Sequence, residues 1–531
     1  MRLAKSFKLI AILCFAGVIA AVAFPVFGQL IDRTRAPNAA NVGIAKSYQQ
    51  QAGVGRGNVM TPDSSLFLIN RDPARSIRRG RQLFQRKFSR SQGLGPSMGD
   101  GAGDINTVKI IGAGLADSCA ACHGRPRGSA GAGGDVVTRP DSRDAPHLFG
   151  LGLKEMLADE ITADLRMIRA VAIARAQQLG SNFEMQLMSK GINYGRITAR
   201  PNGTVDTTAV DGVNPDLRIR PFFLHGETIS IREFAVGAFQ AEMGLQSVDP
   251  DTAAAHNGGV VTTPSGMVLD GTKDAIEAPP TSDPLADPDG DGVVNEVPTS
   301  IVDFMEHYLL NYFKAGLDRQ TDTDLQGRQL FVTIGCAQCH IPDLQIARDR
   351  RHADLETVFD PVRGNPINQL FATASPLFNV VNDGTGLPTL KVPRRGVFRV
   401  NNIFTDFKRH DLGINFYEIN FDGTMQREFL TTALWGLGTT APYGHDGRSH
   451  NLASVIARHG GEALDSRNQF LGLSTTDRDS ILSFLRTLIL FPPDDTASSL
   501  DPINPSVLNY PQFGHGSIRL GALFNNPADP E

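Results

Sequence analysis

The sequence has little cysteine, a single tryptophan and no dense cluster of basic residues. It contains 5 cysteines in 531 residues, carries a net charge of -5 and is 41% hydrophobic and 20% charged. The missing basic cluster excludes the usual surface of a nucleic-acid-binding protein, so we expect no nucleic-acid partner. The composition is that of a globular protein, and the length is sufficient for two or three domains with full hydrophobic cores.

Long apolar runs are also absent, apart from residues 9–24, and these sixteen residues are short for a membrane-spanning helix. Three basic residues precede this run and a small residue, Gly28, follows it. That order is typical of a secretory signal peptide, so we expect residues 1–28 to be removed and the mature protein to be periplasmic or secreted. An uncleaved N-terminal anchor is the alternative.

The cysteines that remain after the signal form two pairs, and a histidine directly follows each pair. The first motif comprises Cys119, Cys122 and His123, and the second comprises Cys336, Cys339 and His340. Four cysteines in an exported protein can form disulfides, and Cys-x-x-Cys alone can serve redox or zinc chemistry. Cys-x-x-Cys-His is the attachment signature of c-type haem, in which the histidine becomes the proximal iron ligand. The sequence therefore predicts two covalently bound haem c groups.

The sequence around these motifs is repeated. The pentapeptide Gly-Arg-Gln-Leu-Phe stands ahead of each motif, at 80–84 and at 327–331. Other matching segments follow in the same order, 145–152 with 431–438 and 224–239 with 444–459. Landmarks that recur in one order predict an internal duplication. Two unrelated cytochrome domains in tandem are the alternative.

Apolar spacing and turn residues divide the chain. The helical pattern is clearest at 80–88, 154–178, 229–243, 301–313 and 476–490. We expect, in chain order, a signal peptide (1–28), an N-terminal arm (29–75), a first cytochrome c-like domain (76–251), a Pro/Gly/Asp-rich linker (252–300), a second cytochrome c-like domain (301–495) and a C-terminal tail (496–531).

Taken together, these segments resemble the bacterial di-haem cytochrome c peroxidase superfamily, which includes MauG-type enzymes and di-haem oxidoreductases. The resemblance is carried by both haem motifs and by "RDAPHLFGLG", "IREFAVGAFQAEMGL", "HDGRSHNLASVIARHGGEA" and "LSTTDRDSILSFLRTL". It implies a mainly α fold of two cytochrome c-like helical domains with long loops and a few short strands. One haem would react, and the other would store or relay electrons.

The resemblance also implies which haem reacts. The family takes the sixth ligand of its electron-transfer haem from the helix that follows the His-Asp-Gly segment. Twelve residues beyond Gly447 stands His459, and the same offset from Gly226 leads to Ala238. Histidine can bind iron and alanine cannot. We therefore expect a bis-histidine electron-transfer haem in the second half and an open, reactive haem in the first.

A catalytic glutamate is implied by the same comparison. Glu242 lies one turn beyond Ala238 and matches the Glu-Met pair that holds the family's catalytic carboxylate. A carboxylate above an open haem can move a proton between the two oxygens of a peroxide. We expect Phe239 to line the same pocket.

Some features depart from a plain peroxidase. Leu224 replaces the tryptophan that the family places between its haems, and the single tryptophan, Trp435, lies in the second half. His147 stands too late to match the removable distal histidine of some peroxidases. The extra length resembles the oxygenase branch, whose members cleave rubber or oxygenate unsaturated fatty acids.

The sequence therefore leaves three functions open. A peroxidase would take electrons from a small donor protein, such as a cytochrome c or a cupredoxin. A di-haem dioxygenase would instead bind a hydrophobic unsaturated substrate. The third function is a non-enzymatic electron-transfer cytochrome, and the open position at Ala238 favours an enzyme over it.

Further side chains are candidates for binding or support. Asp287, Asp289 and Asp291 precede Gly292 as they would in a calcium loop, but the twelfth position is Pro298 rather than glutamate. A solvated Asp/Gly linker is the alternative there. The pairs His410-Asp411 and His445-Asp446 are expected to support the second haem through hydrogen bonds. Solvent-exposed or capping roles are expected for His256, His307, His352 and His515.

Overall fold

The structure is a computed structural model. It describes residue 41 and residues 44–95, 116–123, 145–312, 314–359, 370–420, 423–490, 523–526 and 531. The predicted signal peptide and most of the predicted C-terminal tail lie outside the described residues.

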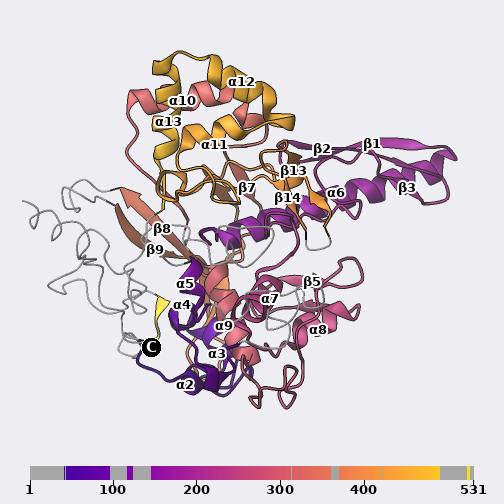
Figure 1. Ribbon diagram of the computed structural model, residues 1–531. Coiled ribbons are helices and arrows are strands. Elements are labelled where there is room, and N and C mark those ends of the chain that lie inside the picture. Colours follow the sequence, from indigo (N-terminus) through magenta and orange to yellow (C-terminus); the bar gives the residue numbers. More distant parts are fainter. Residues whose placement is uncertain are drawn as a thin grey trace, which may run out of the picture. The chain divides into compact units, whose positions relative to one another are not determined.

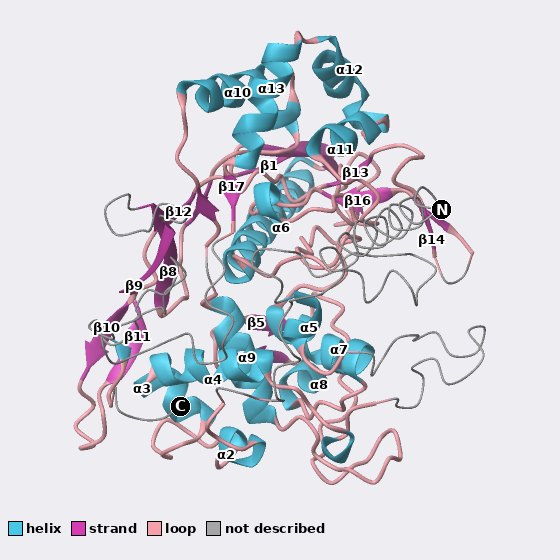
Figure 2. Ribbon diagram, turned by 60° about the vertical axis from the view of Figure 1, so that its left-hand side comes forward, coloured by secondary structure: helices cyan, strands magenta, loops and turns pink. Residues whose placement is uncertain are grey.

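A first group of helices is built around α9. Its members are α2 (Tyr48–Ala52), α3 (Ser65–Arg71), α4 (Pro73–Gln85), α5 (Cys119–His123), α7 (Ile231–Met243), α8 (Pro250–His256) and α9 (Thr299–Leu310). Figure 2 shows α3, α4, α7 and α9 side by side, and α9 is buried along almost its whole length. α4 crosses α9 at Gly80, where a Cβ atom would lie 2.5 Å from the carbonyl oxygen of Phe304. Only glycine lets the two backbones come this close.

A second group contains the later helices. Its members are α10 (Asp322–Thr333), α11 (Leu452–Arg458), α12 (Leu464–Gly472) and α13 (Thr475–Arg486). They lie together in Figure 1, around a core that includes Phe331, Phe470 and Phe484. α10 crosses α13 at Gly327, where a Cβ atom would lie 1.9 Å from the carbonyl oxygen of Ser480. Each copy of the repeated pentapeptide thus supplies the glycine at a helix crossing.

A long helix with a hairpin beside it lies between the two haem motifs in the sequence. α6 (Leu151–Leu179) carries β1 (Phe183–Ser189) and β2 (Ile192–Ala199) along its side, and β3 (Val205–Asp206) completes the three-stranded antiparallel sheet (Figure 1). The first half of α6 is mostly buried.

The remaining strands form two-stranded antiparallel sheets. They pair as β4 (Val260–Thr262) with β5 (Val268–Asp270), β6 (Gly316–Leu317) with β17 (Leu488–Ile489), β7 (Leu344–Ile346) with β12 (Phe398–Val400), β8 (Ala353–Phe359) with β9 (Leu370–Pro376), β10 (Phe378–Val381) with β11 (Leu390–Pro393), β13 (Arg409–Asp411) with β16 (Glu428–Leu430), and β14 (Glu418–Ile419) with β15 (Met425–Gln426). Short paired strands beside longer helices agree with the predicted mainly α class.

Most helices expected from the apolar spacing are present. The patterns at 154–178 and 229–243 correspond to α6 and α7 within three residues. α4 begins earlier than expected, because Pro73 is well suited to the first turn of a helix. α13 ends at Arg486, and the residues after it form β17 instead of a further helical turn.

The structure differs from the predicted linker at 252–300. This segment contains most of α8 together with β4 and β5, and it has a small core of its own. Ala255, Met267 and Leu269 are buried there, together with Ile229 at the start of the α7 segment. The Gly, Pro and Asp residues lie in turns between these apolar positions, and their number conceals the short hairpin in the sequence.

The helix expected to open the second domain also has a different partner. It is α9, which packs on α4 and not on α10 or α13. Its apolar pattern was sufficient to predict a helix but contains no information on which helix it contacts.

Candidate haem sites

The second Cys-x-x-Cys-His motif follows α10 directly. Gly335, at φ 90°, ends the helix, and Cys336–Gln338 form one 3-10 turn. The backbone N–H of His340 donates to the carbonyl oxygen of Cys336 at 3.1 Å, which closes the motif on itself. Cys336 and Cys339 are half-buried thiols and form no disulfide. The two thiols and the histidine thus belong to one compact turn, as attachment of a haem requires.

His340 is held in the orientation of an iron ligand. Its Nδ1 donates to the carbonyl oxygen of Phe404 at 3.1 Å, and its ring lies 6.1 Å from that of Phe331. Burial lowers the pKa of His340 to about 4, so the ring is neutral at pH 7. A neutral imidazole that donates through Nδ1 keeps its lone pair on Nε2. This is the arrangement that fixes a metal-binding histidine.

In His459, as in His340, Nδ1 is the nitrogen that donates a hydrogen bond. It follows α11, and its Nδ1 donates to the carbonyl oxygen of Val455 at 2.8 Å. Phe416 packs edge-on against the ring at 5.3 Å, and burial lowers the pKa of His459. The charge of a protonated His459 also lowers the pKa of His340, so the two rings are close enough to interact. Both rings can therefore offer Nε2 to an iron.

His410 does not fit such a position. Its Nε2 pairs with Asp406 at 2.9 Å and its Nδ1 with Glu462 at 2.7 Å. Burial alone would lower the pKa of His410, but hydrogen bonds to Asp406 and Cys339 raise it to about 11. A charged ring with both N–H groups engaged has no lone pair for iron. His410 instead lies beside Cys339 as a supporting residue, which agrees with its predicted role.

Asp446 supports the second site through an arginine. It pairs with Arg458 at 2.6 Å, and this guanidinium lies 4.5 Å from the centre of the Phe416 ring. Because Arg458 directly precedes His459, the pair fixes the end of α11. His445 stacks on Phe429 with ring centres 4.4 Å apart.

The first motif repeats the orientation of the proximal histidine. Cys119–His123 form α5, and Nδ1 of His123 donates to the carbonyl oxygen of Pro146 at 2.7 Å. The thiol of Cys119 is half-buried, and the side chain of Cys122 lies outside the described part of the chain. His123 therefore presents Nε2 as His340 does.

The loops that lead into α7 and α11 correspond residue by residue. Phe222 bridges to Thr228 in the first, and Tyr443 bridges to Ser449 in the second. These pairs share one offset of 221 residues, as do the helix N-caps Ser230 and Asn451.

Ala238 and His459 each stand eight residues after the N-cap of their segment, Ser230 and Asn451. The offset shared by the two loops also joins Gly226 and Gly447, which both lie in the left-handed region and close equivalent turns. Ala238 is half-buried and has no atom that could bind iron.

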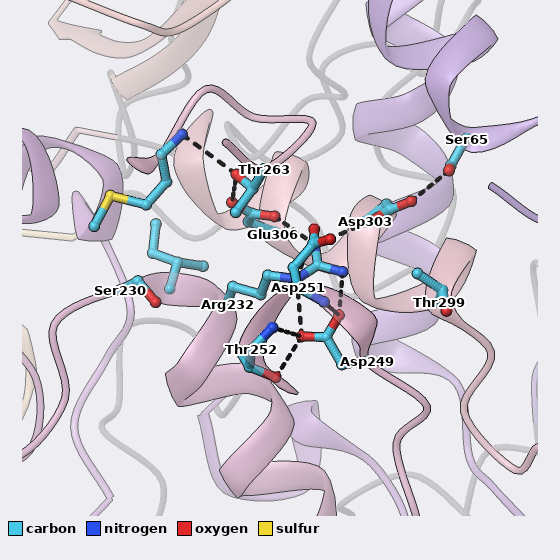
Figure 3. Close-up of polar contacts among 12 residues, drawn as sticks. Ser65, Ser230, Arg232, Asp249, Asp251, Thr252, Thr263, Thr299, Asp303 and Glu306 are labelled. Atoms are coloured by element: carbon cyan, nitrogen blue, oxygen red, sulfur yellow. Dashed lines mark hydrogen bonds and ion pairs between the residues drawn. The ribbon is translucent and has the colours of Figure 1, made fainter. Parts of the chain in front are cut away.

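A buried ionic cluster, missed in the sequence, holds α7 in place. Arg232 is fully buried and donates to Asp249 at 2.6 Å, to Asp303 at 2.9 Å and to Glu306 at 2.8 Å (Figure 3). Ser65 donates to the second oxygen of Asp303 at 2.5 Å. Such clusters fix geometry more than they add stability, because burying the charges is costly. Arg232 thus joins α7 to α8 and α9.

Glu242 and Phe239 lie in the last turns of α7. Glu242 is half-buried, and Phe239 is 2% exposed with its ring edge-on to Phe88 at 6.3 Å. The backbone N–H of Phe88 donates to Asp117 at 2.8 Å, just ahead of the first haem motif. Phe239 therefore makes a core contact that links α7 to the haem segment.

His147 is excluded as a ligand of the first haem. Its Nδ1 accepts from the N–H of Phe149 at 3.2 Å, and its Nε2 donates to the carbonyl oxygen of Trp435 at 2.7 Å. Both nitrogens are therefore used. Trp435 is 4% exposed and packs against Gly150, so it belongs to the hydrophobic core.

Two histidines expected at the surface form a buried pair instead. Nε2 of His307 donates to Nδ1 of His352 at 3.0 Å, and Nε2 of His352 donates to the carbonyl oxygen of Lys391 at 3.0 Å. The Ser76 hydroxyl completes the chain at Nδ1 of His307. Their sequence context shows no pattern, so this pairing was not predictable.

The predicted calcium ligands converge. One oxygen from each of Asp287, Asp289 and Asp291 lies within 4.8 Å of the others. Glu296 is buried near them. The sequence did not predict it as a ligand, because an EF-hand carries its glutamate at the twelfth loop position, which is Pro298 here.

No helix in the described part of the chain is both long enough and apolar enough to cross a bilayer.

Comparison with known proteins finds a matching family model and several similar solved structures. Residues 394–488 match the family model described as "Di-haem oxidoreductase, putative peroxidase", a segment that contains His459 and α11 to α13. This match confirms the resemblance predicted from the motifs. No curated protein matches the chain. A crystal structure of "a MauG-like protein associated with microbial copper homeostasis" is similar at 13% identity, over 63% of this chain and 88% of that chain, with a TM-score of 0.23.

Proposed function

With residues 394–488 matching the di-haem oxidoreductases, we propose that this chain is an exported di-haem c-type peroxidase that reacts at its first haem. The observation that carries the proposal is the equivalence of Ala238 and His459. One site offers two imidazoles to an iron, and the other offers one. An iron with an open position can bind peroxide, whereas a bis-histidine iron is suited to electron transfer.

The donor chemistry fits two haem groups. His340 and His459 each donate Nδ1 to a backbone carbonyl and leave Nε2 for iron, and Nδ1 of His123 donates to a backbone carbonyl in the same way. The described cysteines of both motifs are thiols, which thioether attachment requires. Each haem supplies an iron that exchanges electrons with peroxide or with its neighbour.

An internal duplication accounts for the paired geometry. Each half has a glycine-mediated crossing between the helix ahead of the motif and a later helix, α4 with α9 and α10 with α13. Each half also has the same bridged loop before the helix that carries Ala238 or His459. In this proposal the first copy ends with α9, and α6 with its hairpin is an insertion within that copy.

Glu242 is the proposed acid-base group at the first haem. It would accept a proton from one peroxide oxygen and donate it to the other, so that water leaves. Phe239 would hold α7 against the haem segment. An open site of this kind needs electrons from outside, which a small cytochrome c or cupredoxin would supply in the periplasm.

The proposal is tested on protein made with a haem-ligation system. Mass spectrometry should show about two haem additions, one for each Cys-x-x-Cys-His motif. Oxidation of reduced cytochrome c should then depend on peroxide. If the protein instead consumes oxygen only with an unsaturated lipid, it is a dioxygenase. If neither assay gives turnover, it is an electron-transfer cytochrome.

A further inference from the structure

The cluster at Asp287, Asp289 and Asp291 has a fourth member with unusual surroundings. Glu296 is 2% exposed, and its Oε1 has no hydrogen-bond partner among the described residues. A buried carboxylate oxygen without a partner is costly unless a cation or a donor reaches it. Because Glu296 lies near three converging aspartates, the missing partner is a cation.

The carboxyl group of Glu296 is joined to the aspartate loop through Gln246. Gln246 contacts both sides, because its backbone N–H donates to Oε2 of Glu296 at 2.7 Å and its side-chain amide donates to Asp289 at 3.4 Å. None of the four carboxylates forms an ion pair with any lysine, arginine or histidine that the structure describes.

The backbone around Glu296 is shaped for this placement. Gly93 lies at φ 95°, and a Cβ atom there would stand 2.2 Å from Cδ of Glu296. Any residue other than glycine would displace the carboxyl group. Tyr48 donates its hydroxyl to the carbonyl oxygen of Glu296 at 2.5 Å. Segments distant in the sequence thus position one carboxylate.

We propose that Asp287, Asp289, Asp291 and Glu296 bind one calcium ion. Four oxygen-donor side chains on a flexible loop suit calcium, which accepts six to eight oxygens in variable geometry. Magnesium demands a near-octahedral shell and retains several waters, so a buried carboxylate beside a loop suits it less. The loop supplies three ligands, and Glu296 connects the ion to the protein interior.

This site is joined to the end of α7. Gln246 lies three residues beyond Met243, the last residue of the helix, and Met243 accepts from the N–H of Gly95 at 3.0 Å. An ion at the cluster would therefore hold the α7 end against the 89–95 segment, and its removal would loosen this junction.

Isothermal titration of the holoprotein, stripped with a chelator, tests the site with calcium alone. We expect one calcium ion per chain and a higher thermal midpoint in its presence. Glu296→Gln and Asp289→Asn should each weaken binding by about 10-fold or more, because each removes a charged ligand. Asp283→Asn is the matched control, since Asp283 is exposed in the same segment outside the cluster, and it should bind as wild type does.

The following results would overturn the proposal. They are no heat of calcium binding in wild type, tighter binding of magnesium than of calcium, or unchanged affinity in both Glu296→Gln and Asp289→Asn. Circular dichroism of the variants separates lost binding from lost folding, and Asp289→Asn, on the loop, keeps the test valid if Glu296→Gln fails to fold.

Discussion

α7 and α11 begin alike and end differently. Each follows a bridged loop and starts after a side-chain N-cap, but α7 continues for 13 residues to Met243 whereas α11 stops after 7 at Arg458. His459 therefore lies just beyond its helix, in extended backbone, while Ala238 lies inside a helix. In the proposed arrangement, the position after α11 thus offers an iron ligand, and the corresponding position in α7 has no donor.

The arginines that hold these helices differ as well. Arg232, on α7, is fully buried among Asp249, Asp303 and Glu306. Arg458, at the end of α11, is 18% exposed in its side chain and pairs with Asp446. The helix without a ligand is anchored through the protein core, and the helix before His459 through a single ion pair. We infer that α7 depends on its own packing for its position, because no bond to iron fixes it.

Replacing Ala238 with histidine should remove the difference between the copies. We expect Ala238→His to add a second imidazole at the first haem, give it a low-spin spectrum and abolish peroxide turnover. Ala238→Ser, which adds a small polar group without an imidazole, is the control and should keep the first haem high-spin. A high-spin first haem with normal turnover in Ala238→His would show that residue 238 does not face the iron.

Removing the proton shuttle should have the next largest effect. Glu242→Gln keeps size and polarity but cannot transfer a proton, so peroxide turnover should fall by on the order of 10²–10⁴-fold. Cyanide should still bind the first haem. Glu184→Gln, on the exposed face of β1, is the control. Unchanged turnover in Glu242→Gln would assign acid-base chemistry to another group.

The converse change removes the candidate iron ligand of the second haem. His459→Ala should convert the low-spin signal of the second haem to high spin in electron paramagnetic resonance and leave the first haem unchanged. His410 cannot replace the lost ligand, because both its ring nitrogens are engaged. A surviving low-spin signal would mean that a residue other than His459 binds the second iron.

How much of this the sequence predicts depends on the kind of feature. The haem motifs and α7 were predicted because their signals are local, either a fixed spacing or a helical period. The offset from Gly447 to His459 is also local, and the N-cap equivalence supports it. The partner of α9 was not predictable, because an apolar stripe does not specify which surface it covers.

Buried polar groups were the other main omission. In the sequence, nothing distinguishes Arg232 from other charged residues. Only the fold brings Asp249, Asp303 and Glu306 around it. The role of Glu296 was not predicted, because it depends on contacts with Gly93 and Gln246. Both residues are distant from it in the sequence and belong to no motif. Side chains that satisfy one another across the fold leave no periodic pattern.

The anchoring of α7 can be tested by its effect on stability. Arg232→Met would leave the buried Asp249 and Glu306 without their ion-pair partner, while Asp303 keeps Arg56, and it should lower the free energy of unfolding by about 3–5 kcal/mol. The control is Arg200→Met, because Arg200 pairs with Asp206 at an exposed site and should cost about 0–1 kcal/mol. Urea unfolding measures both, and similar costs would contradict the anchoring role.

The smallest expected effect concerns the acid sensitivity of the core beside α9. Burial lowers the pKa of His352 from 6.5 to about 4, and it also lowers the pKa of His307 well below its usual value. A group whose pKa is depressed in the folded state stabilises the fold fully above its unfolded pKa and loses that contribution as pH falls. Between about pH 6.5 and pH 4, stability should therefore fall by on the order of 1 kcal/mol per pH unit for each such ring.

His352→Gln can still accept from His307 and donate to Lys391 but does not titrate in this range, so the slope should become shallower. His256→Gln, which changes an exposed ring, should leave the slope unaltered. If His352→Gln has the wild-type slope in urea unfolding across this range, His352 does not limit the acid stability of the core.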